Sequence, residues 1–342
     1  MAAPSRQVQV VSYPEGEVGP EHFEVVSVDV PDPGAGQVLV RNTWTSVDPG
    51  LRLRLRAEAP AGYFASFPLG SALDGVLTVG QVIASNAEGF EVGDTVWHPY
   101  GWREHAVVDA GVELMNGAGT MRVLDVADTP PQWYLGPLGA IGLTAYSGLA
   151  VADALGGGET LWVSAAAGAV GSLVAQMGVR LGHRVIASAG SAEKVAWLVD
   201  EVGVAGAFDY HREQPARALE RLAPDGIDVY FDNVGGDHLE AALDALRMHG
   251  RVALCGSISD YEGEPTGPRN IFLATAKHLT LSGFRGSLHM ELLDEMQSRL
   301  GGWLREGSVT HRETVYAGLD QAPVALQDML SGRTSGKTLV RL

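Results

Sequence analysis

The sequence has little cysteine, little positive charge and no long apolar run. Its single cysteine, Cys255, excludes an intramolecular disulfide and a four-cysteine zinc site, and it fits a reducing compartment. The 24 basic residues against 41 acidic ones give a formal net charge of −17. This balance argues against a nucleic-acid-binding protein, because such proteins present a basic face to the phosphates.

Neither a membrane span nor a secretory leader is expected. A membrane-spanning helix needs about 20 predominantly apolar residues in a row, and the sequence has no such stretch. The opening residues Met1–Arg6 are not followed by the apolar core of a signal peptide. We therefore expect a cytoplasmic protein without membrane attachment.

Apolar residues and glycine are plentiful. Hydrophobic residues make up 46% of the chain and charged residues 19%, and there are 44 glycines. Such a composition is globular and can supply a full core, with many tight turns. At roughly 100–200 residues per domain, the 342 residues predict two domains.

The N-terminal part of the chain is rich in short β-strand patterns. Gly and Pro separate runs of β-forming residues, which predicts a barrel-like β unit. The predicted strands are Val8–Val11, Phe23–Val30, Gln37–Arg41, Val76–Ser85 and Asp94–His98.

From Thr160 onward, predicted strands alternate with predicted helices. This rhythm predicts an α/β fold with a parallel, doubly wound sheet that carries helices on both faces. The strands are Thr160–Ala166, Arg184–Ser188, Gly206–Tyr210, Ile227–Asp232, Arg251–Cys255 and Leu279–Phe284. The helices are Val170–Leu181, Ala192–Val202 after the N-cap Ser191, Pro215–Leu222, Leu239–Met248 and Leu288–Glu306.

The last residues return to β character, at Glu313–Tyr316 and Lys337–Leu342. The simplest topology lets them rejoin the N-terminal unit, so that the α/β domain is inserted into the other domain. We predict a β-rich domain from residues 1–132 and 313–342, and a nucleotide-binding domain from residues 133–312.

A glycine-rich turn between the strand ending at Ala166 and the following helix has the Rossmann fingerprint, with Ala166 in place of the first glycine. Gly168 lets the backbone approach a pyrophosphate, and Gly171 lets the helix pack closely on the strand. The helix N-terminus offers free N–H groups to the phosphates. We therefore predict a dinucleotide site here.

The second strand decides between the two nicotinamide cofactors. An NAD site usually has an acidic residue about 20 residues beyond the fingerprint, and here the strand ends at Ala189-Gly190-Ser191 without one. Lys194, in the first turn of the next helix, could reach a 2′-phosphate, although its position alone also fits an ordinary solvated lysine. The pattern favours NADPH.

Local motifs along nearly the whole chain resemble those of the medium-chain dehydrogenase/reductases. Within that superfamily the chain is similar to the zinc-independent prostaglandin reductases (leukotriene B4 dehydrogenases) and alkenal double-bond reductases. The motifs include Ser46-Val47-Asp48-Pro49 with Arg52, Gly142–Tyr146, Val163–Gly171, Ala189–Lys194, Asp232–Gly236, Cys255–Ser259 and Gly336-Lys337. Asp232–Gly236 and Cys255-Gly256 are the most specific of them.

The resemblance implies a GroES-like catalytic domain with an inserted Rossmann domain, a homodimer, and reduction of the C=C bond of α,β-unsaturated ketones and aldehydes with NADPH. It places the pyrophosphate over Ala167, Gly168, Ala169, Val170 and Gly171, and the 2′-phosphate at Lys194, Gly190 and Tyr210. It places Asn233, Cys255, Ser257, Phe284, Ser335 and Gly336 near the ribose and nicotinamide.

Tyr261 aligns with the catalytic tyrosine of this branch. Hydride addition to the β-carbon builds negative charge on the substrate carbonyl oxygen, where a hydrogen-bond donor is needed. A phenol, with a reference pKa of about 10, is protonated at neutral pH and can donate. Without the resemblance, Tyr261 would read as a surface turn residue.

The sequence departs from the branch at Gly50, where many relatives have a tyrosine that caps the substrate pocket, which suggests a more open pocket. No metal site is expected, because the histidines show no metal-ligand spacing and the cysteine of zinc-dependent relatives is missing near Ser46–Asp48. Cys255 has no nearby basic partner that would make it a nucleophile.

Two alternatives to alkenal or alkenone reduction remain. One is another reaction of the same superfamily, either quinone reduction or carbonyl reduction. The other is a protein that binds NADPH without turnover and acts as a sensor or partner.

Overall fold

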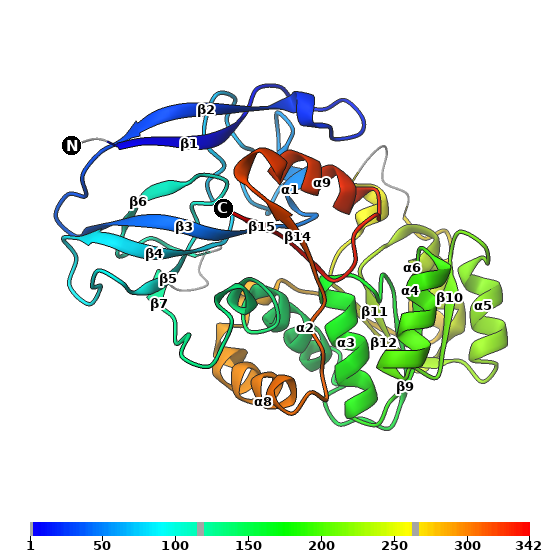
Figure 1. Ribbon diagram of the computed structural model, residues 1–342. Coiled ribbons are helices and arrows are strands. Elements are labelled where there is room, and N and C mark those ends of the chain that lie inside the picture. The colour runs from blue at the N-terminus through cyan, green and yellow to red at the C-terminus, as the bar shows by residue number, and fades with distance from the viewer. Residues whose placement is uncertain (1–2, 115–119, 262–266) are drawn as a thin grey trace. The chain divides into compact units, whose positions relative to one another are not determined.

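The computed structural model describes residues 3–114, 120–261 and 267–342 (Figure 1). The chain divides into two compact units, Met1–Gly139 with Glu313–Leu342, and Ala140–Arg312. Each unit has its own sheet and its own hydrophobic core, and each is described by itself.

The first unit is built on a seven-stranded sheet with the order β14-β15-β3-β4-β5-β7, and β6 pairs with β3. The two C-terminal strands therefore join the N-terminal ones, and β15 pairs antiparallel with β3. A separate hairpin joins β1 and β2. The strands are β1 Ala3–Val10, β2 Phe23–Val30, β3 Gln37–Val47, β4 Thr78–Ser85, β5 Thr95–His98, β6 His105–Asp109, β7 Arg122–Val123, β14 Glu313–Ala317 and β15 Lys337–Arg341.

Short helices complete the first unit. Pro lies in the first turn of most of them, where its fixed backbone angle suits a helix start. They are η1 Pro20–His22, α1 Leu51–Arg54, η2 Pro131–Leu135, η7 Leu319–Gln321 and α9 Ala322–Leu330.

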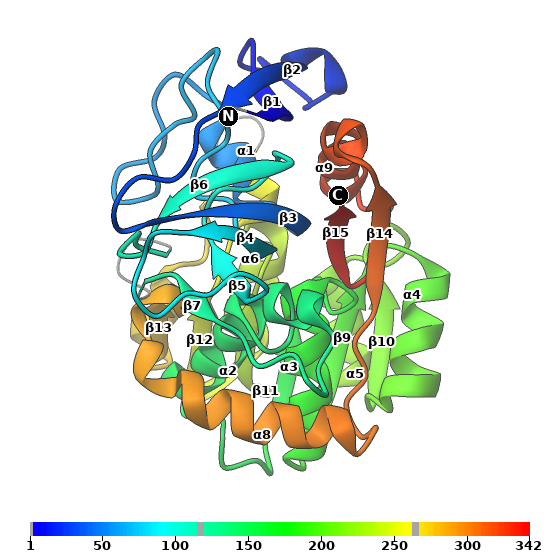
Figure 2. The ribbon, with the colours of Figure 1, turned by 60° about the vertical axis from the view of Figure 1, so that its left-hand side comes forward.

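The second unit has a six-stranded parallel sheet with the order β10-β9-β8-β11-β12-β13, which confirms the predicted doubly wound sheet (Figure 2). The first strand of this sheet, β8, lies in its middle. The next two strands, β9 and β10, extend the sheet on one side of β8, and β11, β12 and β13 extend it on the other. The point between β8 and β11 is where such sheets bind their ligands. The strands are β8 Thr160–Val163, β9 Arg184–Ala189, β10 Gly206–Asp209, β11 Ile227–Asp232, β12 Leu246–Leu254 and β13 Thr280–Gly283.

Helices cover the sheet of the second unit, with α2 packed against α3 and α8, and α5 packed against α6. They are α2 Ala140–Val151, α3 Ala169–Arg180, α4 Ala192–Trp197 with a π-helical continuation η3 Leu198–Val202, α5 Pro215–Leu222, α6 Gly236–Ala245, η4 Ile258–Asp260, α7 Phe272–Ala276, η5 Gly286–Leu288, η6 Met290–Leu292 and α8 Leu293–Arg305. The predicted N-cap is confirmed, since the Ser191 side chain accepts a bond from the Lys194 amide.

Two predicted helices were wrong in their bounds. The helix expected at Leu239–Met248 starts earlier, at Gly236, and ends at Ala245, because Lys277 Nζ donates to the carbonyls of Leu243, Asp244 and Leu246 and so satisfies the C-terminal end of the helix.

The helix expected at Leu288–Glu306 begins only at Leu293. The residues before it form two short 3-10 turns, broken at His289, whose backbone has φ −123 and ψ 42. A close approach of Gly286 to Thr144 holds this segment, because a Cβ on Gly286 would lie 2.8 Å from Thr144 Cα.

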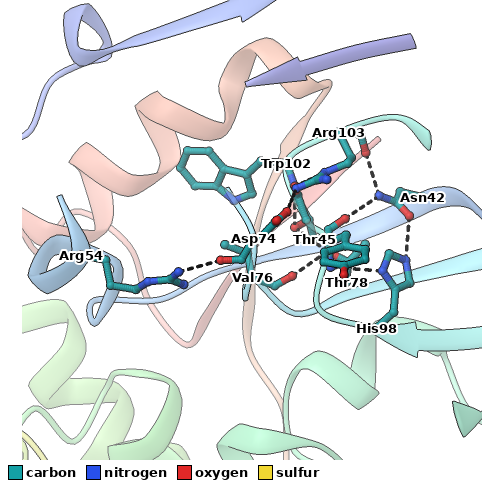
Figure 3. A network of polar contacts seen from close by, with 11 residues as sticks. Asn42, Thr45, Arg54, Asp74, Val76, Thr78, His98, Trp102 and Arg103 are labelled. Carbon is teal, nitrogen blue, oxygen red and sulfur yellow. Dashed lines mark hydrogen bonds and ion pairs between the residues drawn. The ribbon is translucent and has the colours of Figure 1, made fainter. Parts of the chain in front are cut away.

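A buried polar network organises the first unit (Figure 3). The side-chain Nδ2 of Asn42 donates to the carbonyls of Tyr100 and Arg103, and Asn42 Oδ1 lies 2.9 Å from His98 Nε2. The other ring nitrogen of His98 accepts from the Tyr100 amide. The network therefore fixes a neutral His98 with its proton on Nε2. Burial lowers the pKa of His98 to about 3.

This neutral histidine makes stability pH-dependent. A histidine in the unfolded chain takes up a proton below about pH 6.5, whereas His98 in the folded protein does not until about pH 3, so stability is lost as the pH falls through this window. The variant His98→Gln keeps a donor toward Asn42 but cannot be protonated. Between about pH 6.5 and about pH 5, we expect its free energy of unfolding to fall by about 2 kcal/mol less than that of the natural chain. Urea unfolding at the two pH values measures the difference. Equal pH dependence of both proteins would contradict the assignment.

Candidate functional site

The predicted phosphate-binding turn follows β8 and leads into α3. Ala165 adopts φ 47 at the bend, and the Gly168 amide donates to the Ala165 carbonyl over 2.9 Å. Gly168 is the N-cap of α3 and no side chain caps this helix end, which leaves its first N–H groups to an anion.

Gly171 is required by packing. A Cβ at this position would collide with the Ala165 carbonyl and would lie 2.9 Å from Ala166 Cα. The first turn of α3 therefore rests directly on the turn that precedes it, as the fingerprint predicts. Only methyl, isopropyl or hydrogen side chains occur from Ala167 to Gly171, so backbone groups line this surface. A pyrophosphate fits such a turn.

The carboxyl ends of β8 and β11 are tied together by Asn233 and Ser164. The Asn233 amide N–H donates to Ser164 Oγ over 2.9 Å, and the Asn233 side chain donates to the Ser164 carbonyl over 2.8 Å. Asn233 therefore lies at the switch point of the sheet, next to the glycine-rich turn.

Asp232 arranges the loop after β11, a role that the Asp232–Gly236 motif did not reveal. Its buried carboxylate accepts bonds from the amides of Val234 and Gly235 and from the Tyr230 hydroxyl. Burial raises the pKa of Asp232, and these bonds oppose the rise. Gly235 has φ 74, a conformation that favours glycine, and it turns the chain into α6.

The loop after β12 lies against the loop after β11. The amides of Cys255 and Gly256 both donate to the Asp232 carbonyl, and a Cβ on Gly235 would lie 2.9 Å from Ser257 Cβ. Burial raises the pKa of Cys255 to about 12, so the thiol is protonated near neutral pH and is no thiolate nucleophile.

Tyr261 belongs to the same group of residues. A Cβ on Gly256 would lie 3.3 Å from the Tyr261 hydroxyl and 3.6 Å from the Asn233 carbonyl. The missing side chain at Gly256 thus allows the phenol to approach the backbone at the carboxyl edge of the sheet. The structure brings together Asn233, Cys255, Ser257 and Tyr261.

A second group of predicted residues gathers where β9 and β10 end. A Cβ on Gly190 would lie 2.9 Å from the Tyr210 hydroxyl. Lys194 follows in α4, half-buried, and loss of water around it lowers the pKa of its ammonium. His211 also lies here, with its Cε1 3.2 Å from the same Cβ position, and sequence reasoning missed it. Its place directly after Tyr210 is the only signal that could have found it.

The remaining predicted cofactor residues lie elsewhere. Phe284 follows β13 and its ring meets that of Phe231 edge-on, with centroids 6.0 Å apart. Ser335 and Gly336 belong to the first unit, where the Ser335 carbonyl accepts a bond from Thr314 Oγ1 over 2.8 Å.

Lys337 joins β15 to the end of β3. Its fully buried ammonium donates to Ser46 Oγ, to the Val47 carbonyl and to Asp48 Oδ1, over 2.6, 2.8 and 2.7 Å. Burial lowers the pKa of Lys337, and Asp48 opposes this. The Ser46–Asp48 motif and the closing Gly336-Lys337 motif are thus parts of one arrangement.

The small size of Gly50 suggested open space beside it, but that space is filled. The Tyr63 hydroxyl lies so near that a Cβ on Gly50 would collide with it. Gly50 has φ −61 and ψ −18, which any residue adopts, so crowding by Tyr63 and not backbone conformation favours glycine there. A tyrosine from another part of the chain fills this place.

Within residues 3–114, 120–261 and 267–342, no group of three or more His, Cys, Asp or Glu side chains is placed to hold a metal ion. No helix in these same residues combines the length and apolar character of a membrane span.

Comparison with known proteins places the chain in a family. Residues 6–115 match a model described as the N-terminal domain of oxidoreductase, and residues 169–298 match one described as zinc-binding dehydrogenase. A 2-alkenal reductase (NADP(+)-dependent) of Nicotiana tabacum is 37% identical, over 98% of this chain and 97% of the relative. The chain belongs to the medium-chain dehydrogenase/reductases, in the zinc-independent alkenal and prostaglandin reductase branch.

Further members of this reductase branch support the assignment. The (+)-pulegone reductase of Mentha piperita is 36% identical, over 92% of this chain and 90% of the relative. The crystal structure of CurA in complex with NADPH, from Vibrio vulnificus, superposes with a TM-score of 0.90 and 33% identity, over 98% of each chain. The predicted family and fold class are confirmed.

The close packing at Gly171 gives a direct test of the dinucleotide site. We expect Gly171→Ala to raise the dissociation constant of NADPH at least tenfold, because the added methyl forces α3 away from the phosphate-binding turn. Titration of intrinsic fluorescence with NADPH measures it.

Gly156→Ala is the matched control in the same unit, since no atom lies within 4 Å of a Cβ there and its φ is not positive. Similar NADPH binding by the two variants would show that the turn does not hold the cofactor.

Proposed function

We propose that this protein reduces the C=C bond of α,β-unsaturated ketones and aldehydes with NADPH. The proposal is supported by the 2-alkenal and (+)-pulegone reductases among its relatives. It is also supported by the glycine-rich turn Ala167–Gly171, by the group Gly190, Lys194 and Tyr210, and by Tyr261, all of which follow strands of one parallel sheet.

The cofactor fits the residues described. The backbone from Ala167 to Gly171 would hold the pyrophosphate, and Lys194 and Tyr210 would hold the 2′-phosphate beside Gly190. Asn233, Cys255, Ser257 and Phe284 would border the ribose and nicotinamide. When bound, NADPH supplies the hydride that adds to the substrate β-carbon.

Tyr261 carries the proposal for catalysis. Its hydroxyl lies over Gly256 and near Asn233, at the edge where ligands bind in such sheets. There the phenol donates a hydrogen bond to the substrate carbonyl oxygen as that oxygen gains enolate charge. The phenol proton, directly or through water, then reaches the α-carbon. The thiol of Cys255 stays protonated throughout and takes no part as a nucleophile.

Replacing this donor tests the role of Tyr261. We expect Tyr261→Phe to lower kcat by about 10²–10³, as removal of one oxyanion donor does in other enzymes, with NADPH binding unchanged. NADPH consumption with a medium-chain alkenone measures the rate, and mass spectrometry with NMR identifies the product.

A saturated ketone is the expected product of the natural enzyme. An allylic alcohol would identify a carbonyl reductase, and turnover with quinones alone would identify a quinone reductase. Tight NADPH binding without oxidation by any of these acceptors would identify a binding protein.

We also propose a cytoplasmic homodimer. The single thiol, Cys255, fits a reducing compartment. β13 ends the sheet of the second unit, and two exposed apolar side chains, Ile271 (51%) and Phe272 (73%), lie at the start of α7, which precedes β13 in the chain. An edge strand and exposed apolar side chains both suit contact with a second copy of the chain.

A charged residue in place of one of these apolar side chains tests the dimer. We expect Phe272→Glu to convert the dimer to a monomer at micromolar concentration, because it buries a carboxylate without a partner. Light scattering after size-exclusion chromatography measures the mass. Exposed Val92 lies in the first unit, and Val92→Glu is a control that keeps the dimer. A monomeric natural protein would exclude the assembly.

A further inference from the structure

His211 and Tyr210 both lie next to Gly190. The two rings lie 4.3 Å apart between centroids, and both come within 3.2 Å of the Cβ position of Gly190. Gly190 does not have a positive φ, so space and not backbone conformation favours glycine there. Two polar side chains thus border the backbone where β9 ends, four residues before Lys194.

The hydrogen bond of His211 fixes which nitrogen carries the proton. His211 Nδ1 lies 3.0 Å from the Gly190 carbonyl, which can only accept, so the hydrogen is on Nδ1. The Nε2 atom is then the nitrogen that gains a proton when the ring becomes charged. The ring is held by the Gly190 carbonyl, and the His211 side chain is 64% exposed.

Charged and titratable side chains surround His211, and among them is Asp209, whose Oδ1 lies 3.7 Å from His211 Nδ1. Asp209 Oδ1 accepts the His211 amide over 3.0 Å, and Asp209 Oδ2 pairs with Arg212. On α4, Glu193 lies beside Lys194. On α6, His238 meets Tyr210 edge-on, and burial lowers its pKa to about 4, so it is neutral at neutral pH. Histidine side chains change charge between about pH 5 and 8.

We propose that His211 is a further ligand of the adenosine 2′-phosphate and makes the preference for NADPH over NADH pH-dependent. Protonation of Nε2 adds a charge-assisted donor next to those of Lys194 and Tyr210. The preference is then strongest toward acidic pH and weakens as the pH rises. The proposal rests on the NADPH site proposed above.

The test compares two fragments of the cofactor that differ only in the phosphate. Calorimetric titration of the full chain with 2′,5′-ADP and with 5′-AMP gives the ratio of their affinities at about pH 6 and about pH 8. We expect this ratio to fall about tenfold over that range in the natural protein, as expected for loss of one charge-assisted bond.

Variants distinguish the effect of His211 on the affinity ratio from that of the phosphate, which itself ionises at about pH 6. In His211→Asn the ratio does not fall with rising pH, because the phosphate only gains charge. In His211→Lys the ratio stays high at both pH values. His249→Asn, at an exposed histidine early in β12, keeps the behaviour of the natural protein.

Two results would overturn the proposal: an unchanged pH dependence in His211→Asn, or no fall in the natural protein. If 2′,5′-ADP still binds more tightly than 5′-AMP in these cases, the NADPH site stands and only the role of His211 fails. If the two fragments bind equally in the natural protein, the 2′-phosphate site itself is wrong.

Discussion

The second unit depends on the hydrogen bonds of Asp232. Its carboxylate accepts two amides of its own loop and the Tyr230 hydroxyl, while its carbonyl accepts the amides of Cys255 and Gly256. One buried residue therefore holds the loops after β11 and β12 in register. Burying a carboxylate is costly unless its oxygens are hydrogen-bonded, and here the loops that line the candidate site supply those bonds. The position of Tyr261 follows from this arrangement.

The bounds of a helix or strand were predictable from the sequence where residues close by in the chain determine its ends. The helix at Pro215–Leu222 and the strand at Ile227–Asp232 have the bounds that the sequence predicts, since a proline starts the one and an apolar run defines the other. The end of α6 was missed because Lys277, remote in sequence, binds its last carbonyls. Contacts of this kind leave no periodic pattern in the helix itself.

The same distinction applies to the candidate site. The fingerprint residues were predictable because a strand, a glycine turn and a helix are consecutive in the chain. His211 was missed because its position is defined by a glycine that lies far from it in sequence, Gly190. What a small residue implies about space depends on its neighbours, and at Gly50 the Tyr63 hydroxyl occupies the adjacent space.

The buried ammonium of Lys337 has a consequence for the order of synthesis. Its partners Ser46, Val47 and Asp48 leave the ribosome long before it does, whereas every strand of the second sheet lies within Ala140–Arg312. Domains generally fold as units while the chain is made. The unit that begins first in the chain is thus the one completed last, and a chain that ends before Lys337 would hold all of Ala140–Arg312 while its first sheet lacked β15, the strand between β14 and β3.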